Sequence, residues 1–442
     1  MDQGKPNDHN NPTLSIEPTD DLIDVPRRIR LNGLAPGEHV CLSSATQRAQ
    51  GIVWRSEAHF QADQSGRLDL TRDAPLSGDY SGIDGMGLIW SQVPESTGST
   101  AVFADDAISP LHTRLSAATS RGPLQADLHQ RLFTPGVSRH EIRQDGLVGT
   151  LFLPASPGPH PAIMVLNGSG GGINEPRAAL WASRGYAALA LAYFKAPGLS
   201  DYISNTRLEY FKVGLDWLRR TVQPAHDFVA LSGQSRGGEL VLLLASIYQQ
   251  EVNAVLAYVP GAVVHGAQAA ADPRIGRDGP AWLYQGQPLP YLWQDNKTAS
   301  WEPYDQGPPP HRNERAIRTA LRDTDAVARS RIPVERIQAP VLLLSASDDG
   351  SWPSSLYSAM VADKLNEVGH PYPVRRLDFP GAGHNILFPF IPTSQLFFQH
   401  PVSGRPSSVG GTPAANAHAN QVAWLAAQSF LANAVQTARN RS

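Results

Sequence analysis

The sequence predicts a chain of two parts, in which an antiparallel β-sandwich precedes an α/β unit with a parallel sheet covered by helices. From about Ile16 to Arg131, short apolar stretches are separated by turn-forming residues, and long helical periodicity is absent, a pattern typical of a sandwich. After Pro161, apolar stretches alternate with longer helical segments, which indicates a helix-covered parallel sheet. The length of 442 residues also exceeds that of one ordinary domain.

The changes of pattern set the expected boundaries. Residues 1–14 are polar and rich in Asn and Pro, and they are predicted to form a disordered tail. Residues 15–135 are assigned to the β-sandwich and residues 136–442 to the α/β unit. Within the second part, the cover segment, at about 261–332, carries many Pro, Gly and Trp residues and then the helix-like run RNERAIRTALRD. We expect this segment to lie over the functional site.

The elements of the second part each have a signal. The hairpin-like GTLFLP opens the sheet, and the later apolar stretches have the length of buried strands. These stretches are AIMVLN, AALALAYF, FVALSG, AVLAYVP, VLLLSAS and RRLDF. Helices are expected around 178–184, 206–220, 237–249 and 415–432, and a loop is expected in the Gly, Ala and Ser run after His400.

Composition excludes several classes of protein. The 37 basic and 40 acidic residues give a formal net charge of -3, which provides no overall field to attract nucleic acid or an anionic membrane. Cys41 is the only cysteine, which excludes a disulfide framework and fits a reducing compartment. The N-terminal residues lack the pattern of a secretory signal, and no apolar run reaches the roughly 18–20 residues that cross a bilayer. We therefore expect a cytoplasmic protein that does not insert into membranes.

The strongest local signal is FVALSGQSRGGEL, in which Gly233, Ser235 and Gly237 fit the pattern Gly-x-Ser-x-Gly. The motif follows a predicted strand and precedes a predicted helix, which is the context of the nucleophile elbow in α/β-hydrolases. Small residues on both sides of Ser235 relieve the crowding of a sharp turn. We predict an α/β-hydrolase domain with Ser235 as nucleophile, against the alternative of a turn serine between glycines.

In this fold the acid and the histidine follow the serine in chain order. Asp349 is the favoured acid, because it follows the strand VLLLSAS and begins a loop, Asp349-Gly-Ser-Trp-Pro353, that resembles the Asp-x-x-Val-Pro loop of α/β-hydrolases. Asp348 remains the alternative acid, with a loop-capping role if Asp349 is the acid. Two solvated turn carboxylates are the third possibility.

His384 is the predicted base. It lies in LDFPGAGHNILFP, again after a strand and in a loop of small residues. An imidazole has an ordinary pKa of roughly 6.5, so it can accept and return a proton near neutral pH. Other histidines, including His140, His265 and His418, do not follow a late core strand. The alternative is a structural loop histidine.

Catalysis at a carbonyl also requires donors for the oxyanion. The run AIMVLNGSGGGINEP follows an early strand, and its glycines allow backbone N–H groups to point at a developing charge. We predict the backbone N–H groups of Ser169 and Arg236 as these donors. The alternative is a Gly-rich turn that serves only close packing. The run lacks the Gly-x-x-x-x-Gly-Lys-Ser/Thr pattern of a phosphate-binding loop.

Several stretches together resemble one family. The stretches RIRLNGLAP, GMGLIWS, TPGVSR with GTLFLP, NGSGGGINEPRAALWASRGYAALALAYF, LEYF, GQSRGGELVLLLAS, IPVER, DDGSW and FPGAGH resemble, in the same order, the type I acyl-CoA thioesterase and bile acid-CoA:amino acid N-acyltransferase family. The resemblance implies an immunoglobulin-like first domain, a thioester substrate, and the same triad of Ser235, Asp349 and His384. The amidating members of that family carry Cys at the nucleophile position, so Ser235 points to hydrolysis.

The expected activity is therefore hydrolysis of an acyl-CoA to a free carboxylic acid and CoA through an acyl-enzyme. Three alternatives stay open: a carboxylesterase or prolyl-oligopeptidase-like peptidase, an acyl-CoA:amino acid N-acyltransferase, and a binding protein that retained a hydrolase fold. The expected partner is a small-molecule acyl-CoA substrate, and no cofactor, metal or nucleic acid is expected. The sequence assigns no oligomeric state.

Overall fold

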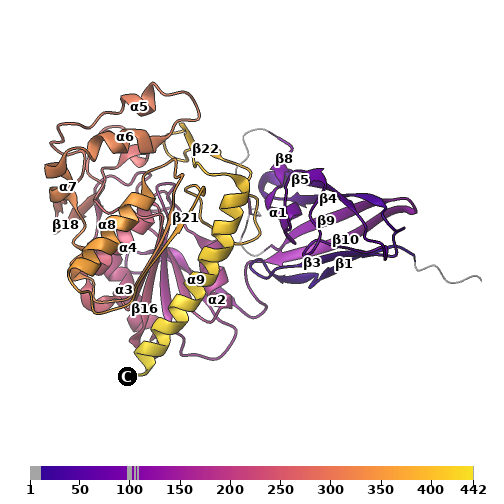
Figure 1. Ribbon diagram of the computed structural model, residues 1–442. Coiled ribbons are helices and arrows are strands. Elements are labelled where there is room, and N and C mark those ends of the chain that lie inside the picture. Colours follow the sequence, from indigo (N-terminus) through magenta and orange to yellow (C-terminus); the bar gives the residue numbers. More distant parts are fainter. Residues whose placement is uncertain (1–10, 97–101, 104–105, 107–108, 442) are drawn as a thin grey trace, which may run out of the picture. The chain divides into compact units, whose positions relative to one another are not determined.

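The computed structural model describes residues 11–96, 102–103, 106 and 109–441 and divides into two compact units (Figure 1). The first unit is Met1–Arg131 with Phe388–Gln395, and the second is Leu132–Leu387 with Leu396–Ser442. The sequence assigns 388–395 to the second part. In the structure this segment instead bonds first-unit residues: its Thr393 N–H donates to the Trp90 carbonyl at 2.9 Å.

The first unit is a β-sandwich of a three-stranded and a seven-stranded sheet. Its strands alternate buried and exposed residues, as in β5, which places Trp54 and Phe60 in the core because successive side chains of a strand point to opposite faces. Nearly all its strand pairs are antiparallel, and β2 with β10 is the parallel exception among the described strands.

The elements of the first unit are β1 (Thr13–Glu17), β2 (Asp20–Leu22), β3 (Arg28–Asn32), β4 (His39–Gln47), β5 (Val53–Gln61), β6 (Leu68–Asp69), β7 (Ser77–Gly78), α1 (Gly87–Trp90), β8 (Val93–Pro94), β9 (Leu111–Thr119) and β10 (Gly122–Arg131).

The prediction of a disordered tail over residues 1–14 is wrong at its end. Residues 1–10 lie outside the described part of the chain, whereas Thr13 and Leu14 belong to β1. This strand pairs Leu14 with Leu31 of β3 and buries Ile16. The polar composition of the tail hides a short strand that has a partner nearby in the sequence.

The second unit is built on an eight-stranded sheet with the order β11-β12-β14-β13-β16-β17-β20-β21. Its strands are β11 (Ser138–Ile142), β12 (Val148–Leu153), β13 (Ala162–Leu166), β14 (Ala187–Ala192), β16 (Val229–Gln234), β17 (Ala254–Tyr258), β20 (Val341–Ala346) and β21 (Val374–Phe379). Only β12 runs against the others in this sheet. The sequence predicts a parallel sheet, and β12 differs because a short hairpin joins it to β11.

Helices cover both faces of this sheet (Figure 1). They are α2 (Glu175–Ser183), α3 (Glu209–Val222), α4 (Arg236–Ile247), α8 (Ser354–Glu367) and α9 (Pro413–Arg439). Helices α2 and α9 share one face, where Trp181 and Trp424 pack with ring centroids 4.5 Å apart. Helices α3, α4 and α8 cover the other face. This architecture and strand order confirm the predicted α/β-hydrolase fold preceded by a β-sandwich.

The cover segment connects β17 to β20. It contains β18 (Trp282–Tyr284), β19 (Gln287–Pro288), α5 (Glu302–Asp305), α6 (Asn313–Ala320) and α7 (Thr324–Ser330). Strand β18 pairs with β15 (Thr206–Arg207), so helix α3 begins at Glu209 instead of the expected 206. The predicted helix at RNERAIRTALRD is α6.

Two further predictions near the C-terminus are corrected. The expected loop after His400 contains a strand, β23 (Pro406–Ser408), which forms an antiparallel hairpin with β22 (Phe397–Gln399). The last helix, α9, also extends beyond the expected 415–432 at both ends. The Ala415 N–H donates a hydrogen bond to the Thr412 hydroxyl oxygen, and this bond caps the start of α9.

Candidate active site

Ser235 occupies the sharp turn between β16 and α4. Its φ of 58° and ψ of -119° place it in the left-handed region, a strained conformation that clusters at functional sites. The two motif glycines allow the turn because a Cβ on Gly233 would lie 2.0 Å from the Gly237 carbonyl oxygen, and one on Gly237 would lie 2.5 Å from the Leu166 carbonyl oxygen. The close approach of three backbone segments therefore requires glycine at both positions.

Asp349 and His384 form a buried pair. The Nδ1 atom of His384 lies 2.9 Å from Oδ1 and 2.8 Å from Oδ2 of Asp349. The Asp349 carboxylate also accepts from the N–H groups of Ser351 and Trp352, which fixes its orientation. A carboxylate that accepts from Nδ1–H holds the imidazole in the tautomer with a free Nε2, the atom that can take a proton.

The three predicted triad residues all follow carboxyl ends of strands of one sheet. Ser235 follows β16, Asp349 follows β20 and His384 follows β21, and these three strands run in the same direction. The structure brings Asp349 and His384 into contact. The half-buried Ser235 hydroxyl makes no hydrogen bond to any residue that the structure describes, so its contact with His384 stays a prediction. Catalytic hydrogen bonds are often long before substrate binds.

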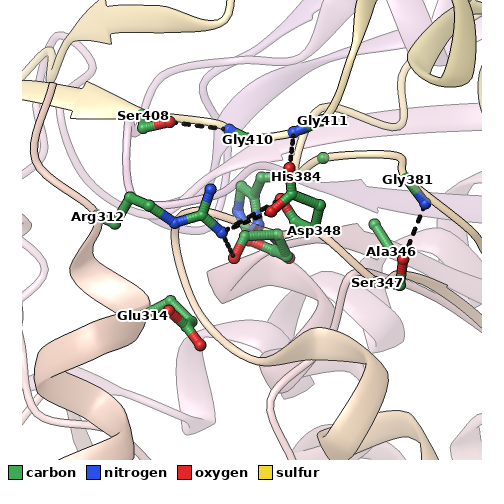
Figure 2. A network of polar contacts seen from close by, with 12 residues as sticks. Arg312, Glu314, Ala346, Ser347, Asp348, Gly381, His384, Ser408, Gly410 and Gly411 are labelled. Carbon is green, nitrogen blue, oxygen red and sulfur yellow. Dashed lines mark hydrogen bonds and ion pairs between the residues drawn. The ribbon is translucent and has the colours of Figure 1, made fainter.

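Asp348 is held by a side chain of the cover segment and by a backbone N–H group (Figure 2). Its Oδ1 accepts from Nη2 of Arg312 at 2.9 Å, and its Oδ2 accepts from the Gly411 N–H at 2.9 Å. Arg312 comes from the cover segment and also donates to the Asp349 carbonyl at 3.2 Å. This arrangement fits the loop-holding role that the sequence left open for Asp348, and it favours Asp349 as the residue that orients the histidine.

The glycine-rich loop after β13 packs against the nucleophile elbow. A Cβ on Gly168 would lie 3.2 Å from the Cβ of Ser235, and the Gly168 N–H already donates to Oδ1 of Asn167. The next N–H, that of Ser169, has no acceptor among the described residues. The same holds for the N–H of Arg236, the first residue of α4, as expected at a helix N-terminus. Both N–H groups therefore remain available as oxyanion donors.

A buried cluster of charged residues lies in and around the first turn of α4, directly after Ser235. The Arg236 guanidinium donates to the Glu239 carboxylate at 2.9 Å and to the Gly266 carbonyl at 2.8 Å. Glu239 also bonds Nδ1 of His265 and Nε1 of Trp282, each at 2.8 Å. Burial acts to raise the pKa of Glu239, but Arg236, His265 and Trp282 outweigh it and hold this pKa below its ordinary value. The carboxylate is thus charged and fixes the first turn of α4.

Glu239→Ala is expected to lower the free energy of unfolding by about 3–5 kcal/mol, because it leaves the Arg236 guanidinium buried without its counter-charge. Urea denaturation measures this loss. Glu367→Ala is the matched control: its carboxylate is 68% exposed in a pair with Lys364, and its loss should change stability by less than about 1 kcal/mol. Equal losses in the two variants would contradict a structural role for the buried cluster.

Arg177 is a site-organising residue that the sequence did not reveal. It lies on α2 with its guanidinium 4.2 Å above the ring of Tyr258. Its Nη2 donates to Oε1 of Gln234 at 3.1 Å and to the Ile386 carbonyl at 3.2 Å. One cation thereby joins the residue before Ser235 to the loop that carries His384. No spacing rule connects a helix arginine with the end of β16 and with a loop after β21.

No group of three or more His, Cys, Asp or Glu side chains in the described part of the chain is arranged to hold a metal ion. None of the helices described is both long and apolar enough to cross a membrane.

Comparison with known proteins gives two family matches. Residues 24–144 match the acyl-CoA thioester hydrolase/BAAT N-terminal region, and residues 206–437 match the BAAT/acyl-CoA thioester hydrolase C-terminal region. Mouse acyl-coenzyme A thioesterase 2, mitochondrial, is 33% identical over 95% of this chain and 89% of its own. Human acyl-coenzyme A thioesterase 1 is 32% identical over 95% of this chain and 96% of its own.

Proposed function

The chain belongs to the acyl-CoA thioester hydrolase and BAAT family, and from this premise we propose that it hydrolyses an acyl-CoA to a free carboxylic acid and CoA. Ser235 is the proposed nucleophile, His384 the base and Asp349 the residue that orients it. The observation that carries the proposal is the buried Asp349–His384 pair, which lies at the strand edge that also carries the strained Ser235. A free Nε2 and an unbonded serine hydroxyl are the two groups that acylation requires.

In acylation, the Ser235 Oγ attacks the thioester carbonyl carbon while its proton passes to Nε2 of His384. The backbone N–H groups of Ser169 and Arg236 donate to the carbonyl oxygen as it becomes negative. The carbon–sulfur bond then breaks, and the imidazolium returns the proton to the leaving CoA thiolate. A thiol has an ordinary pKa of about 8.5, so this step demands less of the acid than the departure of an amine or alcohol.

In deacylation, His384 removes a proton from water, and the resulting hydroxide attacks the acyl-serine carbonyl. The carbon–oxygen bond to Ser235 breaks, the proton returns to the Ser235 oxygen, and the free carboxylic acid leaves. Water must therefore reach the acyl-enzyme in preference to an amine. The presence of serine at position 235 supports hydrolysis, since the amidating members that the chain resembles carry Cys there.

A substrate panel tests this proposal. The specificity constant kcat/KM is compared for acyl-CoA, for a p-nitrophenyl ester of the same acyl group, and for a peptide. We expect the highest value for acyl-CoA. A higher value for the ester or the peptide would instead support a carboxylesterase or a peptidase.

A second assay separates hydrolysis from transfer. Acyl-CoA is supplied with glycine or taurine, and the products are identified by mass spectrometry. We expect free carboxylic acid at the same rate with and without the amine, because the acyl-enzyme reacts with water. Formation of the N-acyl amino acid as the main product would assign the chain to the amidating members of the family.

The compartment is a further proposal. The balanced charge and the single cysteine support a cytoplasmic location. Relatives include human acyl-coenzyme A thioesterase 1 and mouse acyl-coenzyme A thioesterase 2, mitochondrial. Fractionation of the cells that express the chain, with detection of the full-length protein, tests this location.

A further inference from the structure

A second histidine, His400, lies beside the glycine-rich loop after β13, which carries Gly168 and Ser169 and is called the oxyanion loop below. It follows β22 in the hairpin that β23 closes, and it is only 5% exposed. Its Nε2 atom is 3.0 Å from the Oγ of Ser169. Ser169 directly follows Gly168, whose backbone packs against Ser235. His400 therefore contacts the loop that supplies a proposed oxyanion donor.

The hydrogen bonds of the ring assign its tautomer. Nδ1 of His400 accepts from the N–H of Val402 at 3.2 Å and from the N–H of Ser403 at 3.4 Å. A ring nitrogen that faces two N–H donors carries no proton, so the neutral ring holds its proton on Nε2. The pKa of His400 is lowered to about 4, mainly by burial and to a smaller extent by the positive charges of Lys195 and Arg236. The ring is therefore neutral at physiological pH.

The direction of the bond to Ser169 follows from this tautomer. The protonated Nε2 donates, and the Oγ of Ser169 accepts. The hydroxyl proton of Ser169 is then free, since no described residue other than His400 hydrogen-bonds this side chain. A serine hydroxyl that accepts one bond retains one donor for another partner.

The hairpin that carries His400 is held in place. The His400 N–H donates to the Arg405 carbonyl at 2.9 Å, and the Gly404 N–H donates back to the His400 carbonyl at 2.8 Å. Lys195, from the loop after β14, donates to the Pro401 carbonyl. The imidazole is thus anchored on its backbone and on Nδ1, and only Nε2 faces the oxyanion loop.

We propose that His400 is a positioning residue that orients the Ser169 hydroxyl, and that this hydroxyl donates to the substrate carbonyl oxygen together with the N–H groups of Ser169 and Arg236. The inference rests on the proposed function, because it needs a carbonyl that becomes an oxyanion at Ser235. Donors fixed before the reaction stabilise the transition state without the cost of reorganisation.

Matched substitutions test each half of the inference. Ser169→Ala removes the hydroxyl and keeps the N–H, and it should lower kcat by about 10²-fold with little change in KM, because the bond strengthens in the transition state. Ser169→Thr keeps a hydroxyl and should recover much of the loss. His400→Ala should lower kcat by at least tenfold, since misplaced groups cost up to about 10²-fold. His400→Gln keeps an N–H donor and should restore activity.

The double variant Ser169→Ala/His400→Ala tests whether His400 acts through Ser169. If it does, the double variant should have the kcat of Ser169→Ala alone. His370→Gln is the control. The Nε2 atom of His370 bonds the carbonyl of Ala339, just before the amino end of β20 and away from the site. The kcat of this variant should equal that of the wild type. Thermal unfolding of every variant separates loss of fold from loss of positioning.

Three results would overturn the inference: wild-type kcat in Ser169→Ala, equal losses in His400→Gln and His400→Ala, or additive losses in the double variant. All variants are also assayed with a p-nitrophenyl ester, whose carbonyl oxygen develops the same negative charge. If the wild type cleaves the ester and not acyl-CoA, the proposed substrate fails while the ester rates decide the role of His400. A wild type inactive on both substrates would overturn both proposals.

Discussion

Ser235→Ala is expected to lower kcat for acyl-CoA hydrolysis by about 10⁶-fold, the scale seen when a triad nucleophile is removed. The alanine cannot form an acyl-enzyme, and only water attack assisted by the remaining donors is left. The stability of the variant should stay within about 0.5 kcal/mol of the wild type, because the lost hydroxyl makes no hydrogen bond to a described residue. Release of free CoA thiol, together with thermal unfolding, measures both quantities.

Ser156→Ala is the control for the first prediction. Ser156 is exposed in the loop between β12 and β13, which lies at the amino end of β13, away from the site. The Ser156→Ala variant should therefore retain the kcat of the wild type. A fluorophosphonate probe should label the wild type and Ser156→Ala and should not label Ser235→Ala. Wild-type turnover by Ser235→Ala would remove this serine from the mechanism.

Asp349→Asn is expected to lower kcat by about 10⁴-fold. The neutral amide no longer stabilises the imidazolium that forms during attack. Its N–H₂ group can also face Nδ1 of His384, which favours the tautomer whose Nε2 is already protonated and cannot act as a base. The steady-state rate with saturating acyl-CoA measures this effect directly.

Asp348→Asn is the matched control for the second prediction, since it makes the same change one residue earlier in the loop. The Asp348 carboxylate is 49% exposed and pairs with Arg312, so its neutralisation should cost at most about 1 kcal/mol of stability. Its kcat should stay within about tenfold of the wild type. Reversed effects of the two substitutions would make Asp348 the acid and Asp349 the loop-holding residue.

The fold class and the order of the candidate triad were predictable from the sequence for the same reason. Buried strands of a parallel sheet are continuous apolar runs, and their carboxyl ends meet at one edge. Ser235 and Asp349 each follow such a run, whereas His384 follows β21, an edge strand in which only Phe379 is buried. The strand order still predicts that the three residues converge. The glycines around Ser235 add a steric signal, because no other residue fits the turn.

The residues that organise the site were not predictable in the same way. Arg177, Arg312 and His400 lie on a helix, in the cover segment and in a hairpin, and they reach the site through contacts with distant loops. His400 also directly precedes a run of Gly, Ala and Ser that predicts a loop, whereas the pairing of β22 with β23 makes this stretch a hairpin. Tertiary contacts of this kind leave no periodic signal in a single sequence.

The bond between Arg312 and Asp348 has a consequence for engineering. The stretch between β17 and β20 can be exchanged for that of a relative to test whether it affects substrate selectivity. Such an exchange would also replace Arg312, whose guanidinium donates to the Asp348 carboxylate and to the Asp349 carbonyl. In a chimera without arginine at position 312, a change in substrate selectivity could not be separated from a change in the position of the loop that carries Asp348 and Asp349.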